Sequence, residues 1–271
     1  MPLITPHVSA ELLDSPTLGG RRPYLVVLPP SYHVSEERYP VLYLLHGMHG
    51  CEWDWLLKGR VHDRASSMMA AREIREYLIV TPSDGLAGAG TFYVDWHDGS
   101  GRYASYLAHD LVDHVDAVFR TIPHRRARAV AGLSMGGFGA FYLALRYPER
   151  FGAASSHSGA LYLAVPPEWE RAFGPENTPA RRERSLYHLA EAFRPGGPQA
   201  ALCPRLRFDC GEEDYLLDGN RALHTRLQEL GIEHTYVEYP GAHTWDYWAR
   251  HVPETLRFAD AWFGEEQRQP A

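Results

Sequence analysis

Lysine, cysteine and long hydrophobic runs are scarce in this sequence. Lys58 is its only lysine, so arginine supplies nearly all of the 27 basic side chains. The three cysteines are an odd number, and none lies in a CxxC or another zinc-like spacing, which excludes a disulfide framework and a zinc cluster. No segment approaches the ~20 apolar residues of a membrane-spanning helix. We therefore expect idle or buried thiols, no membrane contact and no metal.

The charge of the chain is mildly acidic and evenly spread. The 271 residues carry 34 acidic and 27 basic side chains, a formal net charge of −7, with no basic block. This distribution argues against a nucleic-acid partner. The first seven residues have neither a basic nor an apolar stretch, so no signal peptide is predicted and we expect a cytoplasmic protein.

Apolar runs bounded by turn residues alternate with helical periodicity, which predicts an α/β sheet. The continuous apolar run Val41–Leu45 is typical of a central strand covered on both faces. The sequence contains no repeat or low-complexity linker, so we expect a single domain over residues 1–271. The predicted strands are Tyr24–Leu28, Val41–Leu45, Tyr77–Thr81, Arg128–Ala131, Gly152–Ser156, Arg205–Cys210 and His234–Tyr239.

Helices are predicted between these strands, and one proline-rich segment interrupts the pattern. Helical spacing covers Tyr103–Arg120 and Gly136–Arg146, and a third helix carries Leu223, Leu227 and Leu230 and ends at Gly231. The helix after Thr244 contains Pro253, which is expected to split or kink it. Residues 161–201 hold six prolines and are too short to own a core, so we interpret them as a cap-like insertion.

Gly132-Leu-Ser134-Met-Gly136 follows a predicted strand directly and precedes a predicted helix. This is the G-x-S-x-G pattern of a nucleophile elbow in the strand–turn–helix context that it requires. The tight turn brings the two glycines against neighbouring backbone, where a Cβ would not fit. It also places the Ser134 hydroxyl at the N-terminus of a helix, where developing negative charge is favoured. We predict Ser134 as the nucleophile; the alternative is a glycine-rich turn with a capping serine.

A serine nucleophile requires a base and an acid that orients the base. In folds with this elbow the chain order is serine, acid, histidine. His243 lies in the loop after the last predicted strand, which favours it over His234 and His251 as the base. The acid should follow the preceding strand, and Asp214 suits this position better than Asp209, which is predicted to lie in the strand. Glu212, Glu213 and Asp218 are also available.

Acyl transfer needs N–H donors for the carbonyl oxygen that becomes charged. The Met135 N–H follows the nucleophile directly. Gly47, after the strand Val41–Leu45, lets the backbone turn inward, so the Met48 N–H is the second predicted donor. The pair His46 and His49 has no third ligand at recognisable spacing, so a metal site is not expected there.

Five ordered segments carry a family resemblance that extends from about residue 25 to residue 262. Together with Leu25-Val-Val-Leu-Pro-Pro-Ser-Tyr they resemble the esterase D-like branch of the α/β-hydrolases, which includes tributyrin-type carboxylesterases, S-formylglutathione hydrolases, feruloyl and acetyl-xylan esterases and mycolyltransferases. The segments are Leu44-Leu-His-Gly-Met, Phe92-Tyr-Val-Asp-Trp96, Gly132-Leu-Ser-Met-Gly-Gly137, Asp209-Cys-Gly-Glu-Glu-Asp214 and Gly241-Ala-His-Thr-Trp-Asp-Tyr-Trp248.

The resemblance implies an α/β-hydrolase fold, with a mostly parallel sheet covered by helices on both faces. It implies Ser134, Asp214 and His243 as the triad, with the Met48 and Met135 amides as oxyanion donors. Phe138 stands where S-formylglutathione hydrolases usually carry histidine, which makes a glutathione thioester a weaker expectation. The segment from Phe92 to Trp96 resembles a stretch that borders the acyl pocket in relatives.

These features predict a cofactor-free serine esterase that hydrolyses a small-molecule ester with a short acyl chain through an acyl-enzyme. The alternatives are an acyltransferase or a thioester hydrolase on the same site, and a non-catalytic scaffold, which would be expected to have lost part of the triad. Association into a homo-oligomer stays open. Several aromatic residues could equally form pocket walls or core: Trp53, Trp55, Tyr93, Trp96, Tyr162, Trp169 and Trp245.

Overall fold

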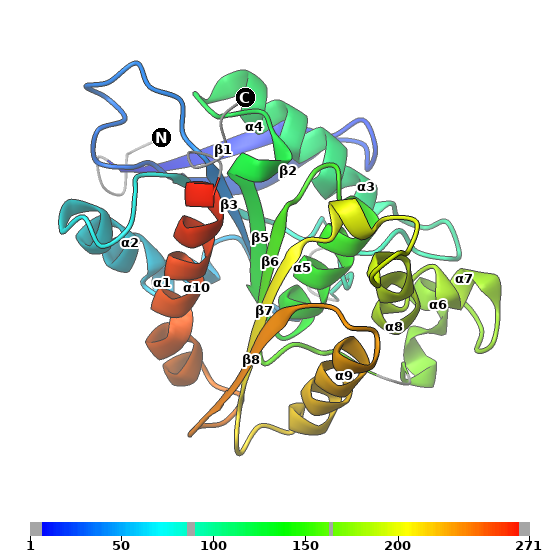
Figure 1. The fold of residues 1–271 in the computed structure, drawn as a ribbon. Helices are drawn as coiled ribbons and strands as arrows, with labels where there is room; N and C mark the ends of the chain where they lie inside the picture. Colours follow the sequence, from blue (N-terminus) through cyan, green and yellow to red (C-terminus); the bar gives the residue numbers. More distant parts are fainter. Residues whose placement is uncertain (1–6, 86–89, 163–164, 266–271) are drawn as a thin grey trace.

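An eight-stranded sheet runs through the protein (Figure 1). The computed structural model describes residues 7–85, 90–162 and 165–265. Six strands are parallel, and β2 lies antiparallel between β1 and β4. The spatial order is β1-β2-β4-β3-β5-β6-β7-β8. The strands are β1 (Val8–Asp14), β2 (Arg21–Val27), β3 (Val41–Leu45), β4 (Leu78–Pro82), β5 (Arg128–Leu133), β6 (Ala153–His157), β7 (Arg205–Gly211) and β8 (His234–Tyr239).

Helices cover both faces of the sheet, as the alternation of side chains along β3 shows. Val41, Tyr43 and Leu45 belong to the apolar cluster that contains side chains of α4 (Val112–Val118), α5 (Met135–Arg146) and α9 (Leu217–Glu229). Leu42 and Leu44 point into the opposite cluster, with side chains of α2 (Val61–Ala70) and α10 (Trp245–Glu265). Because β3 is buried on both faces, its continuous apolar run is explained. The predicted α/β-hydrolase architecture is confirmed.

Shorter helices complete the described chain. Two of them precede α4 and continue into it, so that the predicted helix from Tyr103 is present as far as Val118. They are α3 (Tyr103–Ser105) and a π-helical turn (Tyr106–Leu111); the others are α1 (Asp54–Leu57), α6 (Glu170–Phe173), α7 (Pro179–Arg182), α8 (Leu186–Leu189) and 3₁₀ turns at Arg125–Ala127, Pro167–Trp169, Ala190–Phe193 and Ala200–Leu202. None of the described helices is long and apolar enough to cross a membrane.

All seven predicted strands are present, with shifts of no more than a few residues at their ends. The sequence analysis missed β1 and α2. The strand β1 has a weak apolar alternation because it lies at the edge of the sheet, where only Val8 and Leu13 are buried. The helix α2 carries His62, Asp63 and Arg64 in its first turn, so its apolar stripe is short. The first six residues, used above to predict the absence of a signal peptide, lie outside the described residues.

The prediction that Pro253 splits the last helix is wrong. The helix α10 runs unbroken from Trp245 to Glu265, with Pro253 inside it. A proline in a helix interior costs about 3 kcal/mol through a lost hydrogen bond and a steric clash. Each buried large apolar side chain contributes about 1.5–3 kcal/mol, and five residues of α10 are buried around this proline, which outweighs the cost: Tyr247, Trp248, Val252, Leu256 and Ala259.

The segment 161–201 lies beside α5 and is built of short helices (Figure 1). Its buried side chains, among them Phe173, Leu186 and Phe193, belong to the same apolar cluster as those of α5. The segment therefore shares the core of the sheet. Residues 163 and 164, within it, lie outside the described residues.

Candidate active site

Ser134 lies in the turn between β5 and α5 in a strained backbone conformation. Its φ of 53° and ψ of −118° fall in a region of backbone conformation that residues other than glycine rarely adopt, as expected of a nucleophile elbow. A Cβ on Gly132 would lie 2.4 Å from the Gly136 carbonyl oxygen, and one on Gly136 would lie 2.5 Å from the His46 carbonyl oxygen. The close backbone approach expected from the two glycines is therefore present, and it fixes where the serine hydroxyl points.

The three predicted triad side chains meet at the carboxyl ends of the parallel strands. His243 Nε2 lies 3.0 Å from Ser134 Oγ. On the other side of the ring, His243 Nδ1 lies 2.9 Å from Asp214 Oδ2 and 3.1 Å from Oδ1. An ionised carboxylate accepts only, so Nδ1 carries the proton and Nε2 is free to accept from the serine hydroxyl. The arrangement is chemically able to remove the proton of Ser134.

The acid and base loops are joined by their backbones. The Glu213 N–H donates to the Gly241 carbonyl (2.9 Å), and the Glu212 N–H donates to the Tyr239 carbonyl (2.9 Å). A Cβ on Gly211 would lie 2.2 Å from the Gly241 carbonyl oxygen, so only glycine permits this approach. Because β7 and β8 pair in parallel up to Gly211 and Tyr239, both loops leave the sheet side by side. This contact holds Asp214 and His243 in register.

Asp214 is buried and remains ionised. Burial alone would raise its pKa, but hydrogen bonds from His243, the Leu216 N–H and the Ser158 hydroxyl outweigh burial and lower the pKa below its ordinary value. A carboxylate that stays charged can orient the imidazole and stabilise its protonated form. Three of the other acidic residues considered from the sequence, Glu212, Glu213 and Asp218, are exposed.

Two aromatic rings that sequence reasoning did not identify enclose the imidazole of His243. The ring of Tyr215 lies 4.6 Å from it, and the ring of Trp248 meets it edge-on at 4.8 Å. Trp248 is fixed in turn, because its indole N–H donates to Ser158 Oγ (3.2 Å). The rings restrict the rotation of the imidazole. Their proximity in sequence to Asp214 and His243 was the only available signal.

The loop after β3, which carries Met48, lies beside the predicted nucleophile. A Cβ on Gly47 would lie 3.5 Å from Ser134 Cβ, so this loop touches the elbow. His46 Nδ1 lies 2.7 Å from the Gly47 carbonyl oxygen, and the Asp84 N–H donates to His46 Nε2 (3.2 Å). The Nδ1–H of His46 therefore donates to the Gly47 carbonyl.

That hydrogen bond helps to set the direction of the second predicted oxyanion donor. The Gly50 N–H also donates to the Gly47 carbonyl (3.1 Å). In a trans peptide the C=O and the N–H point in opposite directions, so these two hydrogen bonds turn the Met48 N–H away from the His46 ring. The first donor, the Met135 N–H, opens α5 and lies among the four N–H groups without a partner inside the helix. His46 is thus engaged through both ring nitrogens with backbone groups.

A second histidine–aspartate pair lies beneath the elbow, and the sequence analysis did not identify it. His157 Nδ1 lies 2.8 Å from Asp209 Oδ2, and both side chains are fully buried. His157 Nε2 is 2.8 Å from Thr255 Oγ1. The pair supports the site, because the His157 carbonyl accepts the Ser134 N–H (3.0 Å) and the Asp209 carbonyl accepts the Ser158 N–H (2.7 Å). Asp209 lies inside β7, as predicted.

The aromatic residues that could form pocket walls or core divide into two groups. Trp55 is 1% exposed and donates to the Leu45 carbonyl, and Tyr93 is fully buried and donates to the His46 carbonyl (2.9 Å), so both are core. For these two the expectation of a wall is wrong, because their polar atoms are held by backbone groups inside the fold. The others are partly exposed: Trp53, Trp96, Tyr162, Trp169 and Trp245.

Comparison with known proteins agrees with this geometry. Residues 15–259 match the family described as "Putative esterase". The chain belongs to this family of esterases. A curated relative, an acetyl esterase of Caldicellulosiruptor saccharolyticus, is 27% identical over 240 residues, which are 83% of this chain and 85% of that protein. The predicted resemblance to the esterase branch of the α/β-hydrolases is confirmed, and the protein is a carboxylic ester hydrolase.

Two further members of this esterase group are informative. Esterase Rv1288 of Mycobacterium tuberculosis is 32% identical over 246 residues, or 80% of this chain, which spans about half the length of that relative (51%). A solved structure of a ferulic acid esterase superposes with a TM-score of 0.83 at 28% identity, covering 94% of this chain and 98% of that one.

Proposed function

We propose that this esterase hydrolyses short-chain carboxylic esters through an acyl-enzyme formed on Ser134. The single observation that carries the proposal is the continuous hydrogen-bonded path from Asp214 through His243 to the Ser134 hydroxyl, with donor–acceptor distances of 2.9 and 3.0 Å. The hydroxyl stands on a strained elbow in an esterase of the α/β-hydrolase fold. No cofactor takes part in the proposed steps.

In the first half-reaction Ser134 Oγ attacks the ester carbonyl while His243 Nε2 takes its proton. Asp214 stabilises the imidazolium that forms. The tetrahedral intermediate collapses when His243 gives this proton to the departing alcohol, which leaves the acyl group on Ser134. A water molecule then attacks the acyl-enzyme in the same way, and the acid is released.

The Met48 and Met135 N–H groups would stabilise the negative charge on the carbonyl oxygen. Removing one such donor from a serine hydrolase lowers kcat by about 10²–10³-fold. The orientation of the Met48 amide would therefore contribute strongly to kcat. His46 acts here as a positioning residue, since its ring binds the Gly47 carbonyl and the Met48 N–H therefore points away from the ring.

A short acyl chain is favoured by the packing beside α5. Phe92, Phe138 and Phe173 are almost fully buried and lie with ring centroids 5.3 to 5.6 Å apart, which fills the interior next to the elbow. A long acyl chain would have to displace this cluster. The acetyl esterase among the curated relatives agrees with a small acyl group.

The proposal is tested by kcat/KM over p-nitrophenyl esters from acetate to decanoate, together with labelling by a fluorophosphonate. We expect a maximum at acetate to butyrate and one label, located at Ser134 by peptide mass. A maximum at decanoate would overturn the short-chain part. A label on another residue, or none in a folded protein, would overturn the acyl-enzyme. Product analysis with added alcohols separates hydrolysis from the alternative of acyl transfer.

A further inference from the structure

The insertion contains a cavity with several arginines, in a chain whose net charge is negative. Its volume is about 440 Å³. Arg181, Arg182, Arg184 and His188 line one part of it, and Phe138, Tyr162, Val165 and Leu186 form an apolar part. The carboxylates on its lining are those of Glu170 and Glu176, and both residues are exposed.

The guanidinium groups of two of these arginines donate hydrogen bonds to backbone carbonyls. Arg181 donates from Nε to the Gly174 carbonyl (2.7 Å) and from Nη1 to the Val165 carbonyl (3.5 Å). Arg184 donates from Nε to the Asp95 carbonyl (2.7 Å) and from Nη1 to the Ala180 carbonyl (2.9 Å). Carbonyl oxygens orient a guanidinium but do not neutralise it. Arg184 Nη1 also lies 4.0 Å from Glu183 Oε2, so its charge is partly paired, whereas the half-buried Arg181 keeps its positive charge available to an anion.

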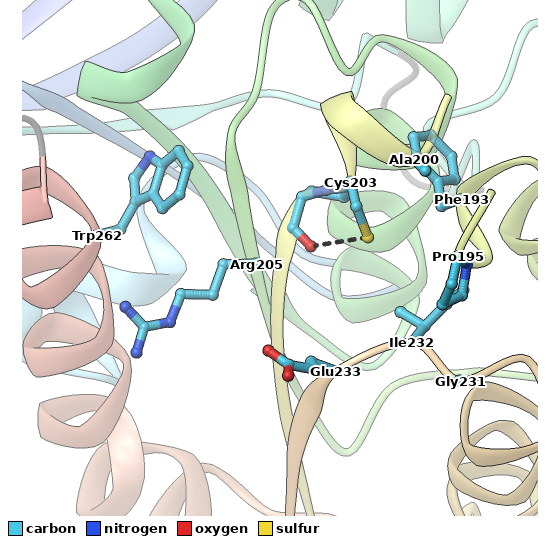
Figure 2. A pocket seen from close by; sticks show the side chains of 10 residues that line it. Phe193, Pro195, Ala200, Cys203, Arg205, Gly231, Ile232, Glu233 and Trp262 are labelled. Atoms are coloured by element: carbon cyan, nitrogen blue, oxygen red, sulfur yellow. Dashed lines mark hydrogen bonds between the residues drawn. The ribbon is translucent and has the colours of Figure 1, made fainter. Parts of the chain in front are cut away.

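The Figure 2 cavity provides a contrast within the same protein. Its volume is about 470 Å³, and it lies where β7 and β8 begin, at the end of the sheet opposite to the triad. Arg205 and Glu233 both line it, so it contains one charge of each sign. A surplus of cationic groups is thus a property of the cavity in the insertion and not of the Figure 2 cavity.

Two residues that line the cationic cavity, Phe138 and Tyr162, lie in chain segments that bond to the Ser134 backbone. The Phe138 N–H donates to the Ser134 carbonyl (3.1 Å), and one helical turn separates the two residues, a rise of about 6 Å. On the other side, the Ala160 N–H donates to the same carbonyl (2.9 Å), and Tyr162 follows two residues later. Burial raises the pKa of Tyr162, with a smaller contribution from Tyr215, the residue whose ring lies against His243.

We propose that this cavity binds an anionic group carried by the ester substrate, such as a carboxylate, a phosphate or a sulfate. The apolar part would accommodate the few carbons between that group and the ester carbonyl, and the guanidinium groups would hold the charge. The inference rests on the proposed function, because the anion is recognised as part of an ester that reacts at Ser134. The proposed substrates are short esters that carry one negative charge.

Matched ester pairs test the proposal. For an anion on the acyl half, mono-4-nitrophenyl glutarate is compared with 4-nitrophenyl 5-methylhexanoate, in which an isopropyl group replaces the carboxylate. For an anion on the alcohol half, 4-acetoxybenzoate is compared with 4-isopropylphenyl acetate. The measured quantity is the ratio of kcat/KM for the anionic ester to kcat/KM for its neutral partner. The ester pair whose ratio falls when an arginine of the cavity is substituted shows whether the acyl half or the alcohol half carries the charge.

Arg182→Glu and Arg181→Gln are the test variants, and Arg194→Glu is the matched control. Arg182 is exposed, so reversing its charge does not disturb the core. Arg194 is exposed in the same insertion but does not line the cavity. We expect Arg181→Gln to lower the ratio about ten-fold and Arg182→Glu about five-fold or more. The control should leave it unchanged, and added salt should lower the wild-type ratio.

Unchanged ratios in both arms for Arg181→Gln and Arg182→Glu, with the neutral ester still hydrolysed at the wild-type rate, would overturn the anion site and leave the proposed function intact. Equal losses in Arg194→Glu would also overturn it, because the effect would then be one of net charge. Failure of the wild-type protein to hydrolyse either member of both pairs would instead contradict the proposed function.

Discussion

Two histidine–aspartate pairs have nearly the same geometry, one within β6 and β7 and the other in the loops after β7 and β8, and they differ in access. His243 Nδ1 is 2.9 Å from Asp214, and its Nε2 is 3.0 Å from the Ser134 hydroxyl. His157 Nδ1 is 2.8 Å from Asp209, and its Nε2 is 2.8 Å from the Thr255 hydroxyl. Hydrogen-bond distances alone would identify both as triads.

Exposure and backbone strain separate the two arrays. The His243 side chain is 15% exposed, whereas His157, Asp209 and Thr255 are fully buried. Thr255 lies within the regular helix α10, whereas Ser134 stands on a strained turn at the beginning of α5. A substrate can reach only the exposed array. The comparison teaches that a triad is defined by access and by the position of its hydroxyl as much as by its hydrogen bonds.

The charges around the two carboxylates differ as well. Burial would raise the pKa of Asp209, but the charge and hydrogen bond of His157 and the charge of Arg207 outweigh burial and hold its pKa far below the ordinary range. Arg207 Nη1 and Tyr247 Oη also donate to this carboxylate, at 2.6 and 2.7 Å. Asp209 is saturated with partners and acts as a structural anchor.

Replacing the two hydroxyls gives the largest expected contrast. Ser134→Ala should lower kcat on p-nitrophenyl acetate by about 10⁴–10⁶-fold, because the nucleophile is lost. Thr255→Val should keep kcat close to the wild-type value and lower the free energy of unfolding by about 1–3 kcal/mol, because His157 Nε2 loses a buried partner. Steady-state kinetics and denaturant unfolding measure both. A large loss of kcat in a folded Thr255→Val protein would contradict this division of roles.

Replacing one carboxylate should lower activity, and replacing the other should lower stability. Asp214→Asn should lower kcat by about 10⁴-fold, since the amide no longer fixes the productive tautomer of His243. Asp209→Asn should lower the free energy of unfolding by about 3–5 kcal/mol, because Arg207 is left buried without its carboxylate. If Asp209→Asn abolished activity at a temperature where it remains folded, the buried pair would have a direct effect on catalysis.

A third histidine sharpens the comparison, because both ring nitrogens of His46 contact backbone groups. His46→Ala should lower kcat by up to about ten-fold with a smaller change in KM, since the Gly50 N–H still holds the Gly47 carbonyl but the ring no longer helps to direct the Met48 N–H. Tyr93→Phe removes only a bond to the His46 carbonyl and should keep kcat within about three-fold. Equal effects of the two substitutions would refute a specific role of the His46 ring.

The pH dependence of stability gives the smallest effect. The pKa values of Asp209 and Asp214 are lowered in the folded state, so both contribute stability above the ordinary carboxyl pKa of about 3.9. That stability is lost as the pH falls below this value and through the lowered pKa values. We expect the free energy of unfolding of the wild-type protein to fall more steeply below pH 4 than that of Asp209→Asn, as measured by denaturant unfolding at each pH. Parallel curves would show that Asp209 is not the carboxylate responsible.

Much of the fold was predictable because the strands are buried on both faces. Apolar runs such as Val41–Leu45 can only be accommodated between two layers of helices, and the seven strands predicted in this way are all present. The edge strand β1 was missed because one side of it meets solvent and its apolar alternation is weak. The unbroken α10 was not expected because local rules for Pro253 do not include the burial of the residues around it.

The candidate site was predictable where a motif fixes a backbone shape. The glycines at positions 132 and 136 indicate the elbow, because no other residue tolerates such close backbone contact. Residues that act through contacts across the sheet have no such signal. Nothing near His157 in the sequence indicates that Asp209 and Thr255 lie beside it, because β6, β7 and α10 meet only after folding.

The sequence by itself determined the elbow, the predicted chain order of nucleophile, acid and base, and the central strands, because each depends on local backbone geometry and on apolar runs. The tertiary structure alone decided which histidine–aspartate pair faces solvent, that the Asp84 N–H donates to His46, and that arginines of the insertion line one cavity with Phe138. These features depend on distances between segments that are far apart along the chain, and those distances are set by packing of the whole core.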